Sequence, residues 1–155
     1  MVNNKGVDLL DLVVVDLAGP NKPQTLKGKL YDMVIVDTFS QRSFVKLLAK
    51  KSDAADVLMR WIPQVEFQTG RKLKRLRIDN GIEFMSGKFT DWLSLRGGVQ
   101  QTTPSYSSQS NGITERMNIT LQDKARTTML EFGLPGSLWG EILLTSCVRT
   151  TPYRH

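Results

Sequence analysis

Cysteine and histidine are nearly absent from this chain of 155 residues, which has one of each, Cys147 and His155. A single cysteine excludes an internal disulfide, and a zinc site built from clusters of cysteine and histidine is excluded as well. Any metal ion would therefore be held by carboxylates. Oxygen ligands of this kind favour Mg²⁺ or Mn²⁺.

Long apolar runs are missing too. No run approaches the roughly 18–20 residues that a membrane-spanning helix needs, and no signal-peptide pattern is present, so we expect no membrane partner. The hydrophobic share of 40% and the charged share of 23% are typical of a soluble globular protein. We expect residues 1–6 to be a disordered start and residues 7–152 to form a single domain.

Positive charge is in excess. Lysine and arginine number 21 against 15 aspartates and glutamates, which gives a net charge of +6 and a pI of about 9.6. Such a balance is compatible with a polyanionic partner such as nucleic acid. Many small soluble domains are equally basic, so charge alone does not decide between the two interpretations.

The first half of the chain predicts a three-stranded meander followed by a helix. Apolar, β-branched runs predict strands over residues 7–17, 31–38 and 43–49, and the short connection at 39–42 predicts an antiparallel hairpin. Apolar spacing predicts a helix that begins at Ser52 as its N-cap and closes at Gly70. Pro63 should kink this helix or end it early.

The second half alternates strands and helices. Residues 71–79 predict a basic strand, and a helix capped by Ser86 leads to a short strand over 99–102. A polar segment over 103–112 predicts a mobile, functional loop. A long helix should run from Ile113 to Gly133, and Ser137 should cap a last helix. The order β-β-β-α-β-α-β-α-α predicts an α/β fold, with a mixed five-stranded sheet flanked by helices.

Three acids stand where a metal site could form. Asp16 ends the run V-V-V-D, Asp79 ends the basic strand, and Glu115 follows after the 35 residues from 80 to 114. Two cations about 3.5–4 Å apart can clamp the attacking and leaving oxygens of a phosphodiester. With 15 acids in the chain, many triples are conceivable. Asp37 also ends a strand, but a turn explains an aspartate there.

The residues around these acids carry a resemblance. D-N-G-I-E-F at 79–84 and N-G-I-T-E-R at 111–116, at this separation, resemble the catalytic core of retroviral and retrotransposon integrases. The stretches at 36–54 and 133–141 (G-L-P-G-S-L-W-G-E) resemble the copia-type branch. The resemblance covers roughly residues 10–150. The zinc-binding and C-terminal domains of full integrases have no counterpart in it, so we expect a core with partial activity.

The resemblance implies an RNase H-like fold and a catalytic D-D-E triad of Asp16, Asp79 and Glu115. The triad would hold Mg²⁺ or Mn²⁺, two ions per site when substrate is bound. It implies 3′-end processing of element DNA and strand transfer into target DNA. It also implies a homodimer or higher oligomer, located in the nucleus or within virus-like particles.

Candidate DNA contacts surround the triad. They are Arg75, Arg77, Asn111, Arg116, Gln122 and Arg126. Many copia-type sequences carry a basic residue four positions after the catalytic glutamate, where this chain has Ile119. Glu83 matches the second acid of the family motif, and we interpret it as a structural acid.

Two other interpretations stay open. One is an inactive or domesticated core that serves as a dimerisation or DNA-binding module. The other is a related transposase or nuclease of the RNase H fold. The N-G-x-x-E-R segment and the G-L-P tail favour an integrase, and the intact triad argues against loss of activity.

Overall fold

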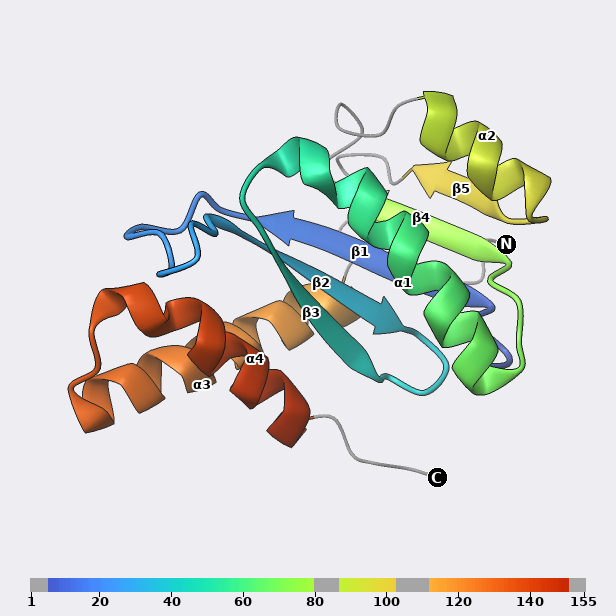
Figure 1. The fold of residues 1–155 in the computed structure, drawn as a ribbon. Helices are drawn as coiled ribbons and strands as arrows, with labels where there is room; N and C mark the ends of the chain where they lie inside the picture. Colours follow the sequence, from blue (N-terminus) through green and yellow to red (C-terminus); the bar gives the residue numbers. More distant parts are fainter. Residues whose placement is uncertain (1–5, 80–86, 103–111, 151–155) are drawn as a thin grey trace.

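A mixed five-stranded sheet forms the centre of the computed structural model, which describes residues 6–79, 87–102 and 112–150. The strand order is β3-β2-β1-β4-β5 (Figure 1). β1 pairs with β2 and β2 with β3 in antiparallel fashion, whereas β4 and β5 continue the sheet in parallel. The strands are β1 (Leu12–Ala18), β2 (Tyr31–Asp37), β3 (Ser43–Leu48), β4 (Arg75–Asp79) and β5 (Val99–Thr102).

Helices cover both faces of this sheet (Figure 1). They are α1 (Ala54–Thr69), α2 (Gly87–Leu95), α3 (Gly112–Phe132) and α4 (Trp139–Thr150), with 3₁₀ turns at Lys51–Asp53 and Gly136–Leu138. The predicted order of strands and helices is confirmed. Over the described residues, no helix has the length and apolar character needed to cross a membrane.

Each face has its own apolar core because side chains alternate along a strand. Val13 and Val15 of β1 pack with α1 and α2 on one face. On the other face, Val34 and Val36 of β2 pack with α3 and α4 through Leu121 and other residues. β1 is buried on both faces, which explains its unbroken apolar run.

β1 begins later than predicted, at Leu12 instead of residue 7. Before it, Leu10 has a φ of 64°, in the left-handed region, and its backbone N–H donates to the Asp37 carboxylate at 3.1 Å. The same carboxylate accepts from the backbone N–H and the hydroxyl of Ser40. A distant side chain therefore takes the Leu10 N–H, while the carbonyls of Leu10 and Asp11 accept from the backbone of Lys74 and Arg75. The structural interpretation of Asp37 is confirmed.

Pro63 does not end its helix early; of the predicted kink or early end, the early end is wrong. α1 continues to Thr69 and closes at Gly70, which has a φ of 68°. Ile62 and Val65, on either side of the proline, are buried against the sheet. This packing outweighs the one backbone hydrogen bond that proline removes.

Two predicted caps are wrong. Ser52 and Ser137 lie inside 3₁₀ turns, and the N-caps of these turns are Lys50 and Pro135. The α-helices begin at Ala54 and Trp139, one residue later than a serine cap would place them. Ser86 lies outside the described residues.

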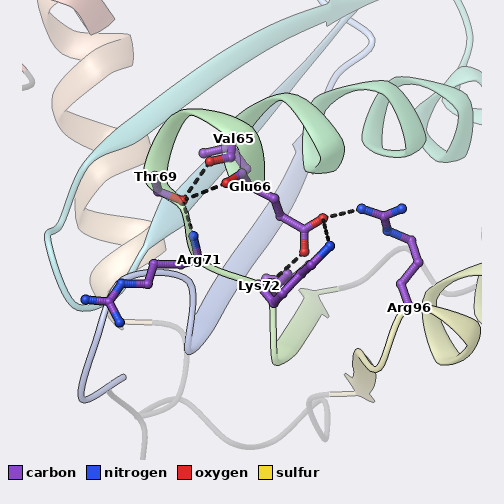
Figure 2. Close-up of polar contacts among 7 residues, drawn as sticks. Val65, Glu66, Thr69, Arg71, Lys72 and Arg96 are labelled. Carbon is purple, nitrogen blue, oxygen red and sulfur yellow. Dashed lines mark hydrogen bonds and ion pairs between the residues drawn. The ribbon is translucent and has the colours of Figure 1, made fainter.

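β4 begins at Arg75, four residues later than predicted. The backbone N–H of Leu73 donates to Glu66 Oε2 at 2.9 Å, so a side chain of α1 takes the bond that a strand partner would receive. Figure 2 shows the Glu66 carboxylate between this backbone and the side chains of Lys72 and Arg96. Glu66 thus joins the end of α1 to the start of β4 and the end of α2.

We expect Asp11 to stabilise the folded protein in a way that is lost in acid. Its carboxylate forms an ion pair with Lys74 Nζ at 3.0 Å and accepts a hydrogen bond from the Val7 backbone N–H, and these contacts lower its pKa. Its stabilising effect should be fully present above the ordinary value of 3.8 and should be lost as pH falls through the lowered pKa. Urea unfolding of the wild type and Asp11→Asn should therefore show a stability difference at pH 7 that narrows towards pH 2.5. An equal difference at both pH values would contradict this.

Candidate active site

Asp16 and Asp79 occupy neighbouring positions at the centre of the sheet. β1 and β4 run parallel, and their register places the two residues directly opposite one another. Paired positions on adjacent strands lie within about 5.5 Å of each other. The side chain of Asp79 is not described, so its direction is not part of this geometry.

α3 reaches this pair through Asn118. Asn118 Nδ2 donates to Asp16 Oδ2 at 3.3 Å. Glu115 lies three residues earlier on α3, and residues at this spacing share a helix face. The Glu115 side chain is exposed. The helix turn that carries Glu115 therefore lies next to the turn that contacts Asp16.

The oxygen atoms gathered here suit Mg²⁺ or Mn²⁺. Asn118 Oδ1 is buried and has no hydrogen-bond partner in the described part of the chain. A buried amide oxygen without a partner needs either a hydrogen-bond donor or a cation. Beside the half-buried Asp16 carboxylate, it is a hard oxygen ligand of the kind that Mg²⁺ and Mn²⁺ prefer. Among the described side chains, which exclude Asp79, no three histidine, cysteine, aspartate or glutamate side chains converge on a metal-binding point. The triad as a metal site stays a prediction.

A second carboxylate follows on the same face of the sheet. Asp32 pairs with Ala18 in register, two residues along β1 from Asp16. It is fully buried, and this burial raises its pKa. Its oxygens accept from Asn21 Nδ2 at 2.8 Å and from Gln122 Nε2 at 3.5 Å. Gln122, predicted as a DNA contact, thus directs its amide nitrogen into the protein.

The two candidate DNA contacts on β4 are poorly accessible. Arg77 is only 3% exposed, and its Nη2 donates to Gln101 Oε1 at 3.3 Å. Burial, with a smaller effect of the Arg75 charge, lowers the pKa of Arg77. Arg75 is half-buried. Neither placement favours a contact with a phosphate backbone.

Much of the basic run before β4 is paired with acids. Arg71 lies 2.9 Å from Asp8, and Lys74 lies 3.0 Å from Asp11. Both members of the Arg71–Asp8 pair are exposed, and a pair of this kind contributes little to stability, whereas Asp11 of the second pair is buried. They do reduce the free positive charge that the run was expected to offer to DNA.

The arginines of α3 are the accessible candidates. Arg116 is exposed, and its Nε donates to the carbonyl of Gly112 at 3.0 Å. The Arg126 side chain is 73% exposed and forms a 4.0 Å pair with Asp123. Ile119, where a basic residue was expected, is also exposed. Asn111 and Glu83 lie outside the described residues, as do residues 103–111 of the loop predicted over 103–112; its last residue, Gly112, begins α3 instead.

A hollow of about 480 Å³ lies beside Arg126. The loop between β1 and β2 forms one side of it, and the indole N–H of Trp139 donates to the carbonyl of Pro23 in this loop at 2.6 Å. The hollow is lined by Pro20, Asn21, Lys22, Gln122, Ala125, Arg126, Met129, Leu130, Leu134, Gly136 and Trp139. Lys22 and Arg126 make its rim cationic.

Sequence reasoning missed Asn118 and Asp32. Asn118 could have been suspected, because it lies one helical turn after Glu115. Asp32 gave a weaker signal, which is a lone acid near the start of a valine-rich strand. Only the register of β1 with β2 shows that it faces α3.

Comparison with known proteins gives a consistent answer. No protein-family model matches the chain. The chain is 37% identical over 145 residues to the retrovirus-related Pol polyprotein from transposon TNT 1-94 of Nicotiana tabacum, across 94% of this chain and 11% of the polyprotein.

Solved structures share the fold. The HTLV-2 integrase catalytic core domain in complex with magnesium matches with a TM-score of 0.65 and 20% identity, over 92% of this chain and 86% of that one. A chain of the simian T-cell lymphotropic virus intasome, in complex with PP2A regulatory subunit B56 gamma, matches with a TM-score of 0.70 and 22% identity, over 92% of this chain and 49% of that one.

These matches agree with the sequence motifs. The chain spans about a tenth of the length of the Pol polyprotein that it matches. Its fold is the RNase H-like fold of integrase catalytic cores. The plant relative is consistent with the copia-type branch. By sequence the chain is related to a retrotransposon Pol polyprotein, and by fold it is similar to retroviral integrase catalytic cores; together the two comparisons support an integrase core.

Proposed function

We propose that this core cuts and joins DNA, with 3′-end processing of element DNA followed by strand transfer into target DNA. One observation carries the proposal. Asp16 and Asp79 lie opposite one another on adjacent parallel strands, and Asn118 bonds Asp16 from the helix that carries Glu115. This arrangement of two strands and a helix supports the triad that the sequence motif predicts.

Each residue has a distinct role in this proposal. Asp16, Asp79 and Glu115 hold Mg²⁺ or Mn²⁺, two ions when DNA is bound. The ions stabilise charge on the phosphate and lower the pKa of the attacking hydroxyl. Asn118 orients the Asp16 carboxylate through its 3.3 Å hydrogen bond. Arg116 and Arg126 contact DNA phosphates from the exposed side of α3.

Assembly and location are part of the proposal. HTLV-2 integrase cores have been solved in dimeric and trimeric forms, which supports a homodimer or higher oligomer here. DNA joining into a host chromosome requires action in the nucleus, after delivery within virus-like particles.

A cleavage and joining assay tests the proposed function. The protein is incubated with labelled duplexes that end in element sequence, with and without Mn²⁺. We expect metal-dependent cleavage near the 3′ end and joined products. Cleavage without joining, both by the chain and by a longer integrase that contains it, would favour a nuclease. DNA binding without cleavage, both by the chain and by a longer integrase that contains it, would favour the inactive module.

The arginines on α3 give a separate prediction. Arg116→Gln combined with Arg126→Gln should weaken DNA binding and reduce the slope of log K against log[salt] by about 0.9 per lost contact, because each phosphate contact releases counterions. Arg60→Gln is the matched control, since Arg60 is exposed on α1 across the sheet. An unchanged salt-dependence slope in the double variant would show that α3 is not part of the DNA-binding surface.

A further inference from the structure

Asp32 is a buried carboxylate that the proposed reaction does not use. It has an exposed fraction of 0% and forms no ion pair in the described part of the chain. Burying a charge without a cation is costly, and an apolar residue of similar volume is often more stable in such a place. Stability alone therefore does not account for Asp32.

The hydrogen bonds of Asp32 link two separate elements. Asn21, in the loop between β1 and β2, donates to Oδ1, and Gln122 of α3 donates to Oδ2. On its far side, the loop is held by Trp139 through the carbonyl of Pro23. Asp32 thus lies where the loop, the sheet and α3 meet.

The position of Gln122 on α3 connects Asp32 to the active site. Gln122 lies seven residues after Glu115, and at 100° per residue the two differ by only about 20° around the helix. Asn118 lies between them on the same side. The Glu115 side of α3 therefore has two described polar attachments to the sheet, at Asp16 and at Asp32.

Apolar packing cannot replace these attachments. Leu121 and Ala125 bury the neighbouring side of α3 against Val34 and Val36. The burial of Leu121 and Ala125 sets which side of α3 faces the sheet, but apolar contacts are non-directional and tolerate small rotations. Hydrogen bonds have narrow angular preferences, and they fix that rotation.

We propose that Asp32 is a positioning residue that sets the rotation of α3 and thereby the place of Glu115. Its catalytic consequence rests on the proposed function. A carboxylate that lies about 6 Å from the helix axis would shift by about 2 Å if the helix rotated by about 20°. A misplacement of about 1 Å can cost about 10²-fold in rate.

Asp32 suits this role better than Asp16 does. Asp16 is a predicted metal ligand, so its bond to Asn118 must share the carboxylate with a cation. The bonds of Asp32 do not involve the predicted metal ligands. Asp32 therefore holds α3 in the same rotation before and after a metal ion binds.

Hydrogen exchange of the 155-residue chain tests the attachment itself. Asp32→Leu keeps the approximate volume but removes both acceptors, and we expect the amides of α3 over residues 112–122 to exchange at least tenfold faster. Asp32→Asn should keep wild-type protection, because its amide can accept from Asn21 and donate to Gln122 once the glutamine amide turns over. Gln122→Leu, which removes the same bond from the helix side, should resemble Asp32→Leu.

A cleavage assay tests the catalytic consequence. We expect Asp32→Leu to lower kcat at least tenfold with the KM for DNA unchanged, whereas Asp32→Asn stays within about twofold of wild type. Asp123→Leu, an exposed change on the same helix, should alter neither exchange nor kcat. Wild-type protection of α3 in both Asp32→Leu and Gln122→Leu would overturn the proposal, and so would wild-type kcat in Asp32→Leu. A wild-type protein without cleavage would refute the proposed function, while the exchange result would still decide whether Asp32 holds α3.

Discussion

Asparagine at Asp16 or Asp79, or glutamine at Glu115, is expected to lower metal-dependent DNA cleavage by about 10³-fold or more. Each change keeps the shape of the side chain and removes its charge. Carboxylates that hold the ions support several kcal/mol of transition-state stabilisation, and each 1.36 kcal/mol corresponds to a factor of about ten. The change should be seen in kcat for cleavage of labelled element ends in Mn²⁺.

The fold should survive these substitutions. Like charges held close together repel one another without a metal ion, so the variants should melt at or above the wild-type temperature in EDTA. Glu131→Gln is the matched control for Glu115→Gln, since Glu131 is exposed on the same helix. Cleavage at the wild-type rate by any of the three variants would remove that residue from the site.

Glu66→Ala is expected to cause a large loss of stability. The Glu66 side chain is 5% exposed, and it bonds the Leu73 backbone and pairs with Arg96 and Lys72 (Figure 2). Removing it leaves a buried backbone N–H without its acceptor and a partly buried arginine without its counter-charge. We expect a loss of about 3 kcal/mol, which corresponds to about 10 °C in Tm for a domain of this size.

Thermal and urea unfolding would measure this loss. Glu131→Ala makes the same substitution at an exposed position and should change stability by less than about 0.5 kcal/mol. In a double-mutant cycle, Glu66→Ala should cost less stability in the Arg96→Ala background than in the wild type, because the two residues share one interaction. Equal effects of Glu66→Ala and Glu131→Ala would show that the joint between α1, β4 and α2 contributes little.

Much of the fold was predictable because the local pattern and the global fold agree. β2 and β3 are short, largely apolar runs between turn residues, and α3 has a regular apolar stripe that ends before Gly133. The prediction failed where a distant side chain satisfies the backbone. Asp37 does so before β1, and Glu66 does so before β4. No local pattern contains such contacts.

The candidate site also has a part that the sequence predicted and a part that it did not. Asp16, Asp79 and Glu115 stood out because motif residues flank them, and the register of β1 with β4 brings the two aspartates side by side. Arg77 and Gln122 were predicted at a DNA surface from type and spacing, yet both turn inward to partners on other elements. Whether an arginine is exposed depends on which helix covers its strand, and residue type does not determine that.

Anomalous scattering from crystals of the chain soaked in Mn²⁺ tests the central claim most directly, because it locates the ion without reference to activity. We predict a manganese peak within coordination distance, about 2.1 Å, of carboxylate oxygens of Asp16 and Asp79. The same peak should be lost in Asp79→Asn. Wild-type crystals with manganese elsewhere, and none between Asp16 and Asp79, would contradict this account.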